Sequence, residues 1–571
     1  MKMEMKCREA RKLMWPGPAR PDMVVALLCA FLLFCLLPAG LAQATEVQDV
    51  LRIRVEQIRR SGEFQIGEDF ISAVIVLPEF YENRDFEPAW TERHKVENLL
   101  KAIRGIQADG LYPWDYHLEG IERLLAEEAD GGGGESYISA DLDMLLTDAI
   151  LRLAYHMLFG KVDPERLDPN WNLSGEIDGL EPAAGLEKAL GSTNLYTFIE
   201  EFKPDQHFYL RLKDALASYR GIADMGGWGE VPLGKVLKKS EKDERVPILK
   251  ERLYLTGDLE DIGNDTSLLF GADLEEAVMR FQTRHGLSAD GVVGPRTLEA
   301  MNVPVSDRID QIRVNLERTR WVMQDITETF VIVNIAGFMT YYVDDSKIQW
   351  EGRSQVGKIY RKTPVFKADM KYLVFNPTWT VPPTILAKDV LPAVQKDVSY
   401  LERKNMSVLD RSGKAVNPQG IDWAKYDARN FPYVFRQEPG PENALGLIKF
   451  IFPNEHSVFL HDTPSKSLFN RDARTFSSGC IRVENPFELA ELLLSDQPGW
   501  TREKIAAVVE SGKTQTVYLT EPVPVLLLYW TAFPGEDGIC NFREDVYDRD
   551  PAVLKALGDE FSLRRSHMEQ R

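Results

Sequence analysis

The chain has 571 residues, which at about 150 residues per domain is enough for roughly four domains, each able to bury its own core. Apolar residues make up 44% of the sequence and charged residues 27%, with ordinary amounts of glycine and proline, which argues against a largely disordered or multi-span membrane chain. The formal net charge of −20 argues against a nucleic-acid partner, because binding to a phosphate backbone depends on clustered lysine and arginine.

Residues 1–44 have the pattern of an export signal. Six basic and three acidic residues in the first half of this segment precede an apolar run of 16 residues from Met23 to Pro38. Ala42 and Ala44 supply the small residues that a signal peptidase reads, so cleavage after Ala44 is the leading interpretation. The run is shorter than the roughly 20 residues that span a bilayer, although a single uncleaved membrane anchor remains open. We therefore expect an exported protein.

Only two of the five cysteines, Cys480 and Cys540, lie beyond this segment. In an oxidising compartment two cysteines can pair, so a disulfide between them is the structural alternative to any chemical role. Nothing in the sequence around Cys540 demands that pairing, whereas the surroundings of Cys480 indicate a reactive thiol.

Residues 45–250 have mainly helical patterns and are predicted to form a helical scaffold domain. Leu145, Ile150, Leu153 and Met157, for example, lie near the spacing of one helix face. We find no catalytic constellation in this third of the chain.

Residues 251–304 have a compact helix, turn, helix pattern. An amphipathic helix ends at Gly286, an Asp290-Gly291 turn follows, and another helix begins near Pro295. The segment resembles the peptidoglycan-binding repeat of exported wall enzymes. That resemblance implies a peptidoglycan-binding domain in the form of a small module of three helices, with a purely structural helical hairpin as the alternative.

Residues 305–325 are predicted to form a connecting helix, after which the hydrophobic period changes from that of helices to that of strands. Residues 326–535 are expected to be a mostly-β domain. A helical and then polar segment at about 384–440 interrupts it, and an insertion of that length is typical of a lid or binding element. We expect this insertion to form a capping subdomain and residues 536–571 to form a C-terminal tail. The predicted fold class is multidomain α+β.

The candidate catalytic residues lie between Val458 and Pro486. Cys480 follows a Ser-Ser-Gly turn, and His461 lies 19 residues upstream at the end of a predicted strand. There the imidazole can act as the base that converts the thiol into a nucleophilic thiolate. The backbone N–H groups of Gly479 and Cys480 are candidates for an oxyanion hole. The pattern predicts nucleophilic catalysis by a Cys/His pair.

The candidate substrate-binding residues lie in the same turn or at the strand edge before the insertion: Arg482, Ser477, Ser478, Trp379 and Asn376. Arg482 can hold a carboxylate or add positive potential, and a core position is the equal alternative for Trp379. The group that orients His461 is left open between the adjacent Asp462 and a backbone carbonyl. The eight histidines are scattered and form no zinc-binding pattern, so we expect no metal and no cofactor.

The sequences HDTP, which contains His461, and SSGCIR, which contains Cys480, resemble the signature of the L,D-transpeptidase (YkuD-type) catalytic domain. Many members have histidine before the Gly-Cys pair. Serine at Ser478 is typical of the long, periplasmic YcbB-like branch, to which the order of scaffold, peptidoglycan-binding module and catalytic domain with an insertion is also similar. The resemblance implies that His461 and Cys480 are the catalytic pair and that the protein is periplasmic.

The same resemblance implies a reaction. A tetrapeptide stem of peptidoglycan would be the acyl donor, a cysteinyl thioester the intermediate, and the diaminopimelate amine of a second stem the acceptor, which gives a cross-link between two diaminopimelate residues. It further implies that carbapenems inhibit the enzyme, and it makes wall-synthesis enzymes candidate protein partners.

Two other functions stay open at this level. A hydrolase with the same nucleophile would let water replace the acceptor amine, and would trim the stem as an L,D-carboxypeptidase or release a wall-linked protein. A non-catalytic wall-binding scaffold is the third candidate, and the intact pair of His461 and Cys480 argues against it.

Overall fold

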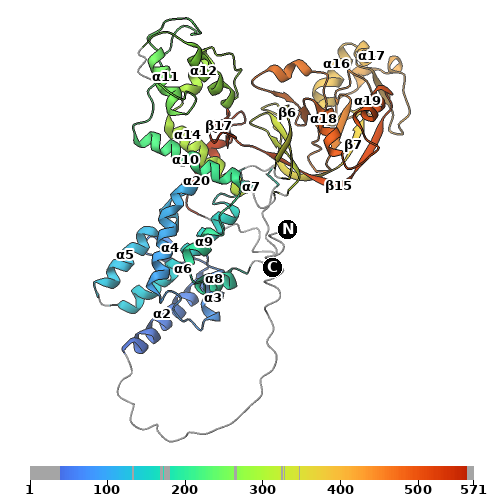
Figure 1. Cartoon of the computed structure of the whole chain (residues 1–571). Coiled ribbons are helices and arrows are strands. Elements are labelled where there is room, and N and C mark those ends of the chain that lie inside the picture. Colours follow the sequence, from blue (N-terminus) through green and yellow to red (C-terminus); the bar gives the residue numbers. More distant parts are fainter. Residues whose placement is uncertain are drawn as a thin grey trace.

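A computed structural model of the chain (Figure 1) describes residues 39–561 except 132–133, 168–170, 173–180, 263–266, 323–325, 327 and 346. The apolar run of the predicted export signal lies outside the described residues. The first described helix, α2 (Ala39–Ser61), begins before the predicted cleavage position. None of the described helices is both long enough and apolar enough to cross a membrane.

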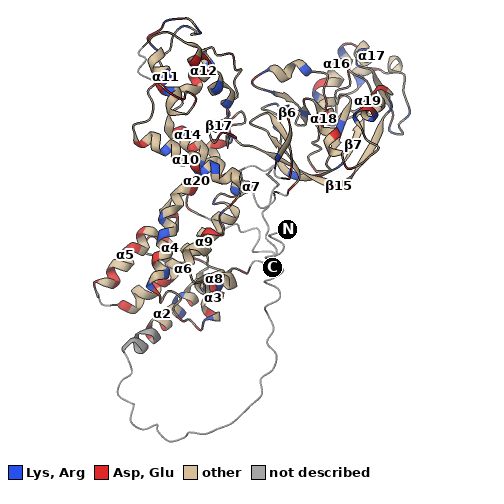
Figure 2. Cartoon of the chain, viewed as in Figure 1, with Lys and Arg blue, Asp and Glu red and all other residues tan. Residues whose placement is uncertain are grey.

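The N-terminal part is a helical scaffold built around one long central helix. The helices are α2, α3 (Val76–Asn83), α4 (Arg93–Gly105), η1 (Ile106–Asp109), η2 (Pro113–Tyr116), α5 (Leu118–Ala129), α6 (Glu135–Phe159), α7 (Pro164–Leu167), α8 (Pro182–Leu190) and α9 (Leu195–Glu200). A short hairpin of β1 (Gln65–Ile66) and β2 (Asp69–Phe70) is added to them. α6 is buried on most sides, since α2 and α5 pack along it. Figure 2 shows acidic and basic residues interspersed over these helices.

A separate module of three helices follows, as the family resemblance implies: α11 (Val246–Leu255), α12 (Ala272–Arg284) and α13 (Pro295–Met301). It has its own hydrophobic core, in which Leu249, Val278, Phe281 and Met301 are fully buried. Two further helices, α10 (His207–Asp224) and α14 (Val305–Arg320), pack against each other. They lie between this module and the scaffold (Figure 1).

The second half of the chain is a β domain whose main sheet closes on itself. Its strands are β4 (Phe330–Asn334), β5 (Met339–Asp344), β6 (Lys347–Gly357), β7 (Val365–Phe375), β11 (Ile448–Ile451), β12 (Leu460–His461), β13 (Thr475–Ser477), β14 (Ile481–Val483) and β15 (Gln515–Leu528). The strands are hydrogen-bonded in the order β11-β12-β14-β6-β5-β4-β15-β7, and β7 pairs again with β11. β13 pairs with β6, and β3 (Trp171–Asn172) adds to β7. Closure removes most of the free edges on which other chains could pair.

Two helices, α18 (Pro486–Leu493) and α19 (Arg502–Glu510), and the short helix η7 (Lys466–Asn470) accompany the sheet. The parallel pair β4 and β15 lies in its centre, and the register places Val525 opposite Val331. Both residues are fully buried. Runs of Val, Ile and Leu form central strands of this kind because both faces are covered.

The predicted insertion forms a subdomain with its own sheet and core, which we call the cap. It consists of β8 (Trp379–Thr380), α15 (Pro383–Ile385), η4 (Leu386–Val390), α16 (Leu391–Lys396), α17 (Ser399–Arg403), β9 (Met406–Leu409), η5 (Pro418–Gly420), η6 (Trp423–Lys425) and β10 (Val434–Gln437). Its three strands pair in the order β8-β10-β9. Val394 and Phe435 are fully buried in its core. The cap leaves the main sheet after β7 and returns to it at β11, next to the strand that ends at His461.

Residues 536–571, which the sequence analysis treats as a tail, contain ordered elements. β17 (Cys540–Phe542) pairs with β16 (Ala532–Pro534), and α20 (Asp550–Gly558) follows. Cys540 lies in this strand with only 2% of its surface exposed, and not beyond the last strand as the sequence pattern indicates. α20 packs on α14, so the end of the chain returns to the connecting helix.

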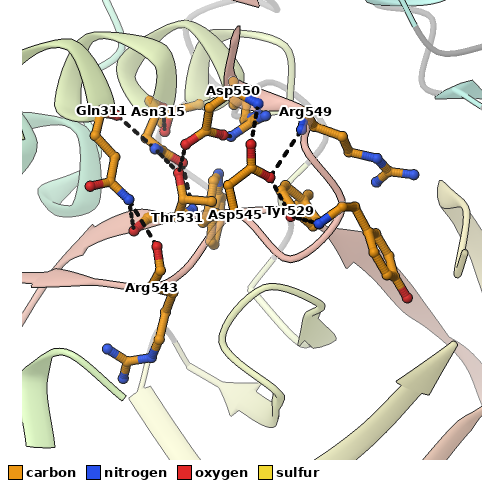
Figure 3. Close-up of polar contacts among 12 residues, drawn as sticks. Gln311, Asn315, Tyr529, Thr531, Arg543, Asp545, Arg549 and Asp550 are labelled. Atoms are coloured by element: carbon orange, nitrogen blue, oxygen red, sulfur yellow. Dashed lines mark hydrogen bonds and ion pairs between the residues drawn. The ribbon is translucent and has the colours of Figure 1, made fainter. Parts of the chain in front are cut away.

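A polar network joins α14 to this C-terminal segment (Figure 3). Asn315 and Thr531 exchange two hydrogen bonds: the Asn315 amide donates to Thr531 Oγ1 at 2.8 Å, and the Thr531 N–H donates to Asn315 Oδ1 at 2.9 Å. Thr531 Oγ1 donates in turn to Asp550 Oδ2 at 2.7 Å, and Asp550 pairs with Arg318 of α14 at 2.5 Å. Because these groups are buried or half-buried, the network fixes the connecting helix against the β domain.

Candidate active site

Two neighbouring strands bring the predicted Cys/His pair onto one face of the main sheet. β12 and β14 are parallel, and their register sets His461 opposite Arg482. Cys480, which immediately precedes β14, is therefore level with Phe459. Side chains alternate between the faces of a strand, so Leu460 and its partner in β14 enter the core while these four residues share the other face.

The His461 ring is oriented by a backbone carbonyl. Its Nδ1 donates to the carbonyl oxygen of Asp462 at 2.5 Å, which leaves Nε2 as the nitrogen that can accept a proton. The Asp462 carboxylate points elsewhere, where it accepts the Leu447 N–H at 2.9 Å and contacts Lys466. Of the two groups that the sequence leaves open, the structure shows the carbonyl in this position.

Burial and charge keep the His461 imidazole neutral. Burial and the nearby cations Arg482 and Lys449 together lower its pKa to about 3, against the opposing effect of backbone hydrogen bonds. Lys449 belongs to this environment because it lies on β11 directly opposite His461. At neutral pH the ring can therefore accept a proton.

Cys480 has a free, half-buried thiol. Burial raises the pKa of this thiol, while the backbone of Phe459 and the cations Lys449 and Arg482 act in the opposite direction. Its Sγ lies 3.7 Å from the carbonyl oxygen of Ser457, to which it donates. The resting site thus holds a thiol and a neutral imidazole, and attack by sulfur requires proton transfer to a base. Cys540 is also a free thiol, so the disulfide alternative is not realised.

Ser477 shapes the turn that carries Cys480. Its hydroxyl accepts the Gly479 N–H at 3.0 Å and donates to the Cys480 carbonyl at 2.5 Å. Gly479 has φ +121°, a conformation that favours glycine, and its carbonyl accepts the Thr363 hydroxyl at 2.8 Å. The Gly479 N–H is therefore occupied. The Cys480 N–H has no hydrogen-bond partner among the described residues. Of the two predicted oxyanion-hole donors, the Cys480 N–H is therefore the one available to a ligand.

Ser478 is exposed and links the turn to the cap through an arginine that sequence reasoning missed. Arg361 donates to Ser478 Oγ at 2.8 Å and pairs with Asp389 of η4 at 3.2 Å. Arg361 and Ser478 are 117 positions apart, so no local sequence pattern connects them.

The remaining predicted residues separate into two groups. Arg482 lies on the Cys480 face, where it donates to Gln355 at 3.2 Å while its buried Nε has no partner among the described residues. Asn376 is buried, and its amide donates to backbone carbonyls at the end of α19, so it serves a structural contact. Trp379 packs against the cap core, which is the alternative that the sequence allowed.

Lys449 is a second residue that sequence reasoning missed. Its Nζ lies 3.5 Å from the centroid of the Phe459 ring, an arrangement in which a cation and an aromatic face attract each other. Burial lowers the pKa of this amine. Lys449 and Arg482 together give the Cys480 face two cations. In the part of the chain that the structure describes, no three His, Cys, Asp or Glu side chains are grouped as metal ligands.

Comparison with known proteins identifies the domains. Residues 328–518 match the L,D-transpeptidase catalytic domain. The chain contains an L,D-transpeptidase domain. Residues 242–301 match a putative peptidoglycan binding domain, and residues 76–216 match a scaffold domain.

A curated putative L,D-transpeptidase of Haemophilus influenzae is 37% identical over 248 residues, which is 43% of this chain and 50% of that protein. The chain thus spans about half the length of the curated relative it matches. The crystal structure of an L,D-transpeptidase from Xylanimonas cellulosilytica aligns with 52% of this chain and 98% of its own, at 15% identity and a TM-score of 0.15.

Proposed function

We propose that the protein is a peptidoglycan L,D-transpeptidase that works in the periplasm and joins the diaminopimelate residues of two stem peptides. The observation that carries this proposal is the register of β12 and β14, which puts Cys480 and His461 on one face within the matched catalytic domain. The adjoining peptidoglycan-binding domain supports the same substrate.

In the first half-reaction His461 Nε2 takes the proton of the Cys480 thiol as Sγ attacks the carbonyl carbon that precedes the terminal D-Ala of a tetrapeptide. The developing oxyanion is stabilised by the Cys480 N–H. The C–N bond then breaks, the leaving amine takes the proton from His461, and D-Ala departs. A thioester between Cys480 and the shortened stem remains.

In the second half-reaction the side-chain amine of a diaminopimelate residue on another stem attacks the thioester carbonyl. His461 accepts the proton of the attacking amine, the C–S bond breaks, and the proton returns to the Cys480 sulfur. Lys449 and Arg482 supply positive charge for the carboxylates of the two peptides. The net change is one amide bond broken and one formed.

Mass spectrometry of products tests the proposal. The purified protein is incubated with disaccharide-tetrapeptide, and we expect a cross-linked dimer together with one released D-Ala per cross-link. Hydrolysed tripeptide without any dimer would instead identify an L,D-carboxypeptidase. Absence of both products would support a non-catalytic wall-binding protein.

A further inference from the structure

A large cavity lies where the peptidoglycan-binding module meets the β domain. Its volume is about 550 Å³, within the usual range for ligand sites. One wall comes from the end of α12 and from α13, and the other from the turn between β4 and β5 and from residues 469–474, which lead into the turn that carries Cys480. None of Cys480, His461 and Arg482 lines it, so this cavity is separate from the candidate active site.

The lining of this cavity is rich in arginine although the whole chain is acidic. Its lining contains six arginines and three acidic residues. The arginines are Arg296, Arg308, Arg353, Arg471, Arg474 and Arg543, and the acidic residues are Glu299, Asp472 and Glu544. The chain as a whole has a net charge of −20. A local excess of positive charge in a cleft attracts anions more strongly than the same charges on an open surface.

Two of the six arginines are already neutralised. Arg296 pairs with Asp472 at 2.6 Å across the two walls, and Arg353 forms a two-pronged pair with Glu484 at 2.6 and 2.7 Å. These pairs hold the walls in place and leave little charge for a ligand.

Three others, Arg308, Arg474 and Arg543, have no carboxylate within ion-pair distance among the described residues. Each is held by neutral oxygens instead. Arg474 donates to three backbone carbonyls at 2.8, 3.1 and 3.2 Å. Arg543 donates to two at 2.7 Å, and Arg308 donates to one carbonyl at 3.1 Å and to the amide oxygen of Gln311 at 2.8 Å. The Nε of Arg308, a residue that is 7% exposed, has no partner among the described residues. These guanidinium groups are positioned but not neutralised.

Each of the same three guanidinium groups lies over an aromatic ring, which adds a second contact to its hydrogen bonds. Arg308 lies 4.6 Å from the centroid of Phe542, Arg543 lies 4.9 Å from that of Phe533, and Arg474 lies 5.3 Å from that of Phe338. Figure 3 shows the Arg543 side chain pointing away from the polar network that holds its backbone. Fixed, planar donors suit the two oxygens of a carboxylate.

Burial lowers the pKa of each of these three guanidinium groups to about 10. The charge of the neighbouring Arg353 contributes to this lowered pKa at Arg474, and the charge of Arg474 contributes to it at Arg543. A bound anion would relieve this mutual repulsion.

We propose that this cavity is a second binding site for carboxylate-bearing stem peptides, with Arg474 and Arg543 as its principal ligand-binding residues and Arg308 at its base. The proposal rests on the proposed function, because it takes the ligand from the same wall polymer. Stem peptides carry several carboxylates on a short chain, and the peptidoglycan-binding module forms one wall of the site. A peptidoglycan chain whose stem peptide is bound here is held close to Cys480, which raises the effective concentration of its other stem peptides at the active site.

Calorimetric titration of the full chain tests the proposal. The chain carries Cys480→Ala so that no turnover occurs, and it is titrated with a diaminopimelate-containing tetrapeptide. We expect two peptide sites, and we expect Arg474→Gln and Arg543→Gln each to weaken one of them by about tenfold or more, because each removes a charged hydrogen bond. The exposed Arg93→Gln on α4 is the matched control and should leave both sites unchanged.

A parallel titration with inorganic phosphate shows whether the site binds the peptide carboxylates specifically or binds phosphate equally well. Phosphate that binds as tightly as the peptide and displaces it would overturn the assignment to stem peptides. Unchanged peptide binding in both arginine variants would overturn the site itself. Arg474→Lys keeps the charge but not the planar guanidinium, so we expect it to bind the peptide with intermediate affinity. If Arg474→Gln and Arg474→Lys lose peptide affinity equally and both have lowered thermal stability, Arg474 has a structural role.

A separate assay, acylation by a carbapenem of chains that retain Cys480, tests the proposed function independently of the titration. Arg474→Gln should acylate as the parent chain does. Failure of the parent chain to acylate would count against the proposed function alone, since the titration does not use the thiol.

Discussion

The neutral imidazole of His461 has a consequence for the pH dependence of catalysis. Its pKa is lowered to about 3 by burial and by Arg482 and Lys449, and only the neutral ring accepts the proton of the Cys480 thiol. We expect kcat/KM for acylation to stay level as pH falls from about 7 to about 5, where an ordinary histidine with a pKa near 6.5 would already be protonated. The rate of carbapenem adduct formation by intact-mass measurement gives this profile.

Arg482→Gln removes one of the cations that lower the pKa of His461. The acid limb of the profile should therefore move to higher pH in this variant. An acid limb near pH 6.5 in the parent chain, or one that does not move in Arg482→Gln, contradicts this account of the site.

Cys480→Ala should abolish cross-linking while leaving the fold intact, because the thiol is half-buried and contributes little packing. His461→Ala should lower activity by a factor on the order of 100 or more through loss of the base. Product analysis and thermal unfolding of both variants measure the two effects. The matched control is Cys540→Ala, whose thiol is buried in β17, remote in sequence from the nucleophile turn. Dimer formation that persists in Cys480→Ala would rule out the assigned nucleophile.

Sequence patterns find residues whose chemistry is local and miss those whose role depends on distant contacts. Cys480 lies in a Ser-Ser-Gly turn and His461 at the end of a strand, and these local patterns predict their roles. The sheet places both residues on one face. Asn376 instead binds the end of α19, more than 130 positions away, and nothing near it in the sequence indicates that partner. Arg361 was missed for the same reason.

At the scale of elements, the contact between the cap and the nucleophile turn leads to a prediction about the ratio of hydrolysed to cross-linked product. In the proposed mechanism the thioester must await an amine in the presence of water, so an open cleft favours hydrolysis over transfer. Asp389→Ala breaks the ion pair from the cap to Arg361 and leaves the bond from Arg361 to Ser478 in place. We expect it to raise the ratio of hydrolysed tripeptide to cross-linked dimer more than it slows acylation.

Deletion of the cap at about residues 384–440 should shift the ratio further in the same direction. Asp397→Ala is the control within the cap, since Asp397 pairs with Arg403 of the cap itself. If chromatography of the products shows tripeptide and dimer falling in parallel in Asp389→Ala and in the deletion, the insertion is a folding or binding element and does not exclude water.

The elements that the sequence missed are short. β9 and β10 have four residues each and lie among Gly, Pro and Asn, so their alternation is too brief to separate from loop. They become strands because they pair with each other and with β8 around the buried Phe435. β17 and α20 are similar, since they are fixed by contacts with β16 and α14 that no local pattern encodes.

At the scale of the whole molecule, α14 decides how the peptidoglycan-binding module is presented to the catalytic domain. The network around Asn315 and Thr531 ties this helix to the end of the β domain (Figure 3). Under the proposed function, a soluble substrate needs only the catalytic cleft, whereas a polymeric wall is bound by the module and reacts at Cys480 in the same encounter. Rigid linkage therefore matters for the polymer and not for the soluble fragment.

Asn315→Ala separates these two demands. It leaves the Thr531 N–H and hydroxyl without one partner each, at about 1–3 kcal/mol of stability for the unsatisfied buried group. We expect cross-linking of disaccharide-tetrapeptide to be retained and cross-linking of intact sacculi to fall several-fold, both measured on the same preparation below its unfolding temperature. Ser306→Ala, an exposed change at the start of the same helix, is the control. Equal loss on the two substrates would mean that the network stabilises the catalytic domain and that the module acts independently of its orientation.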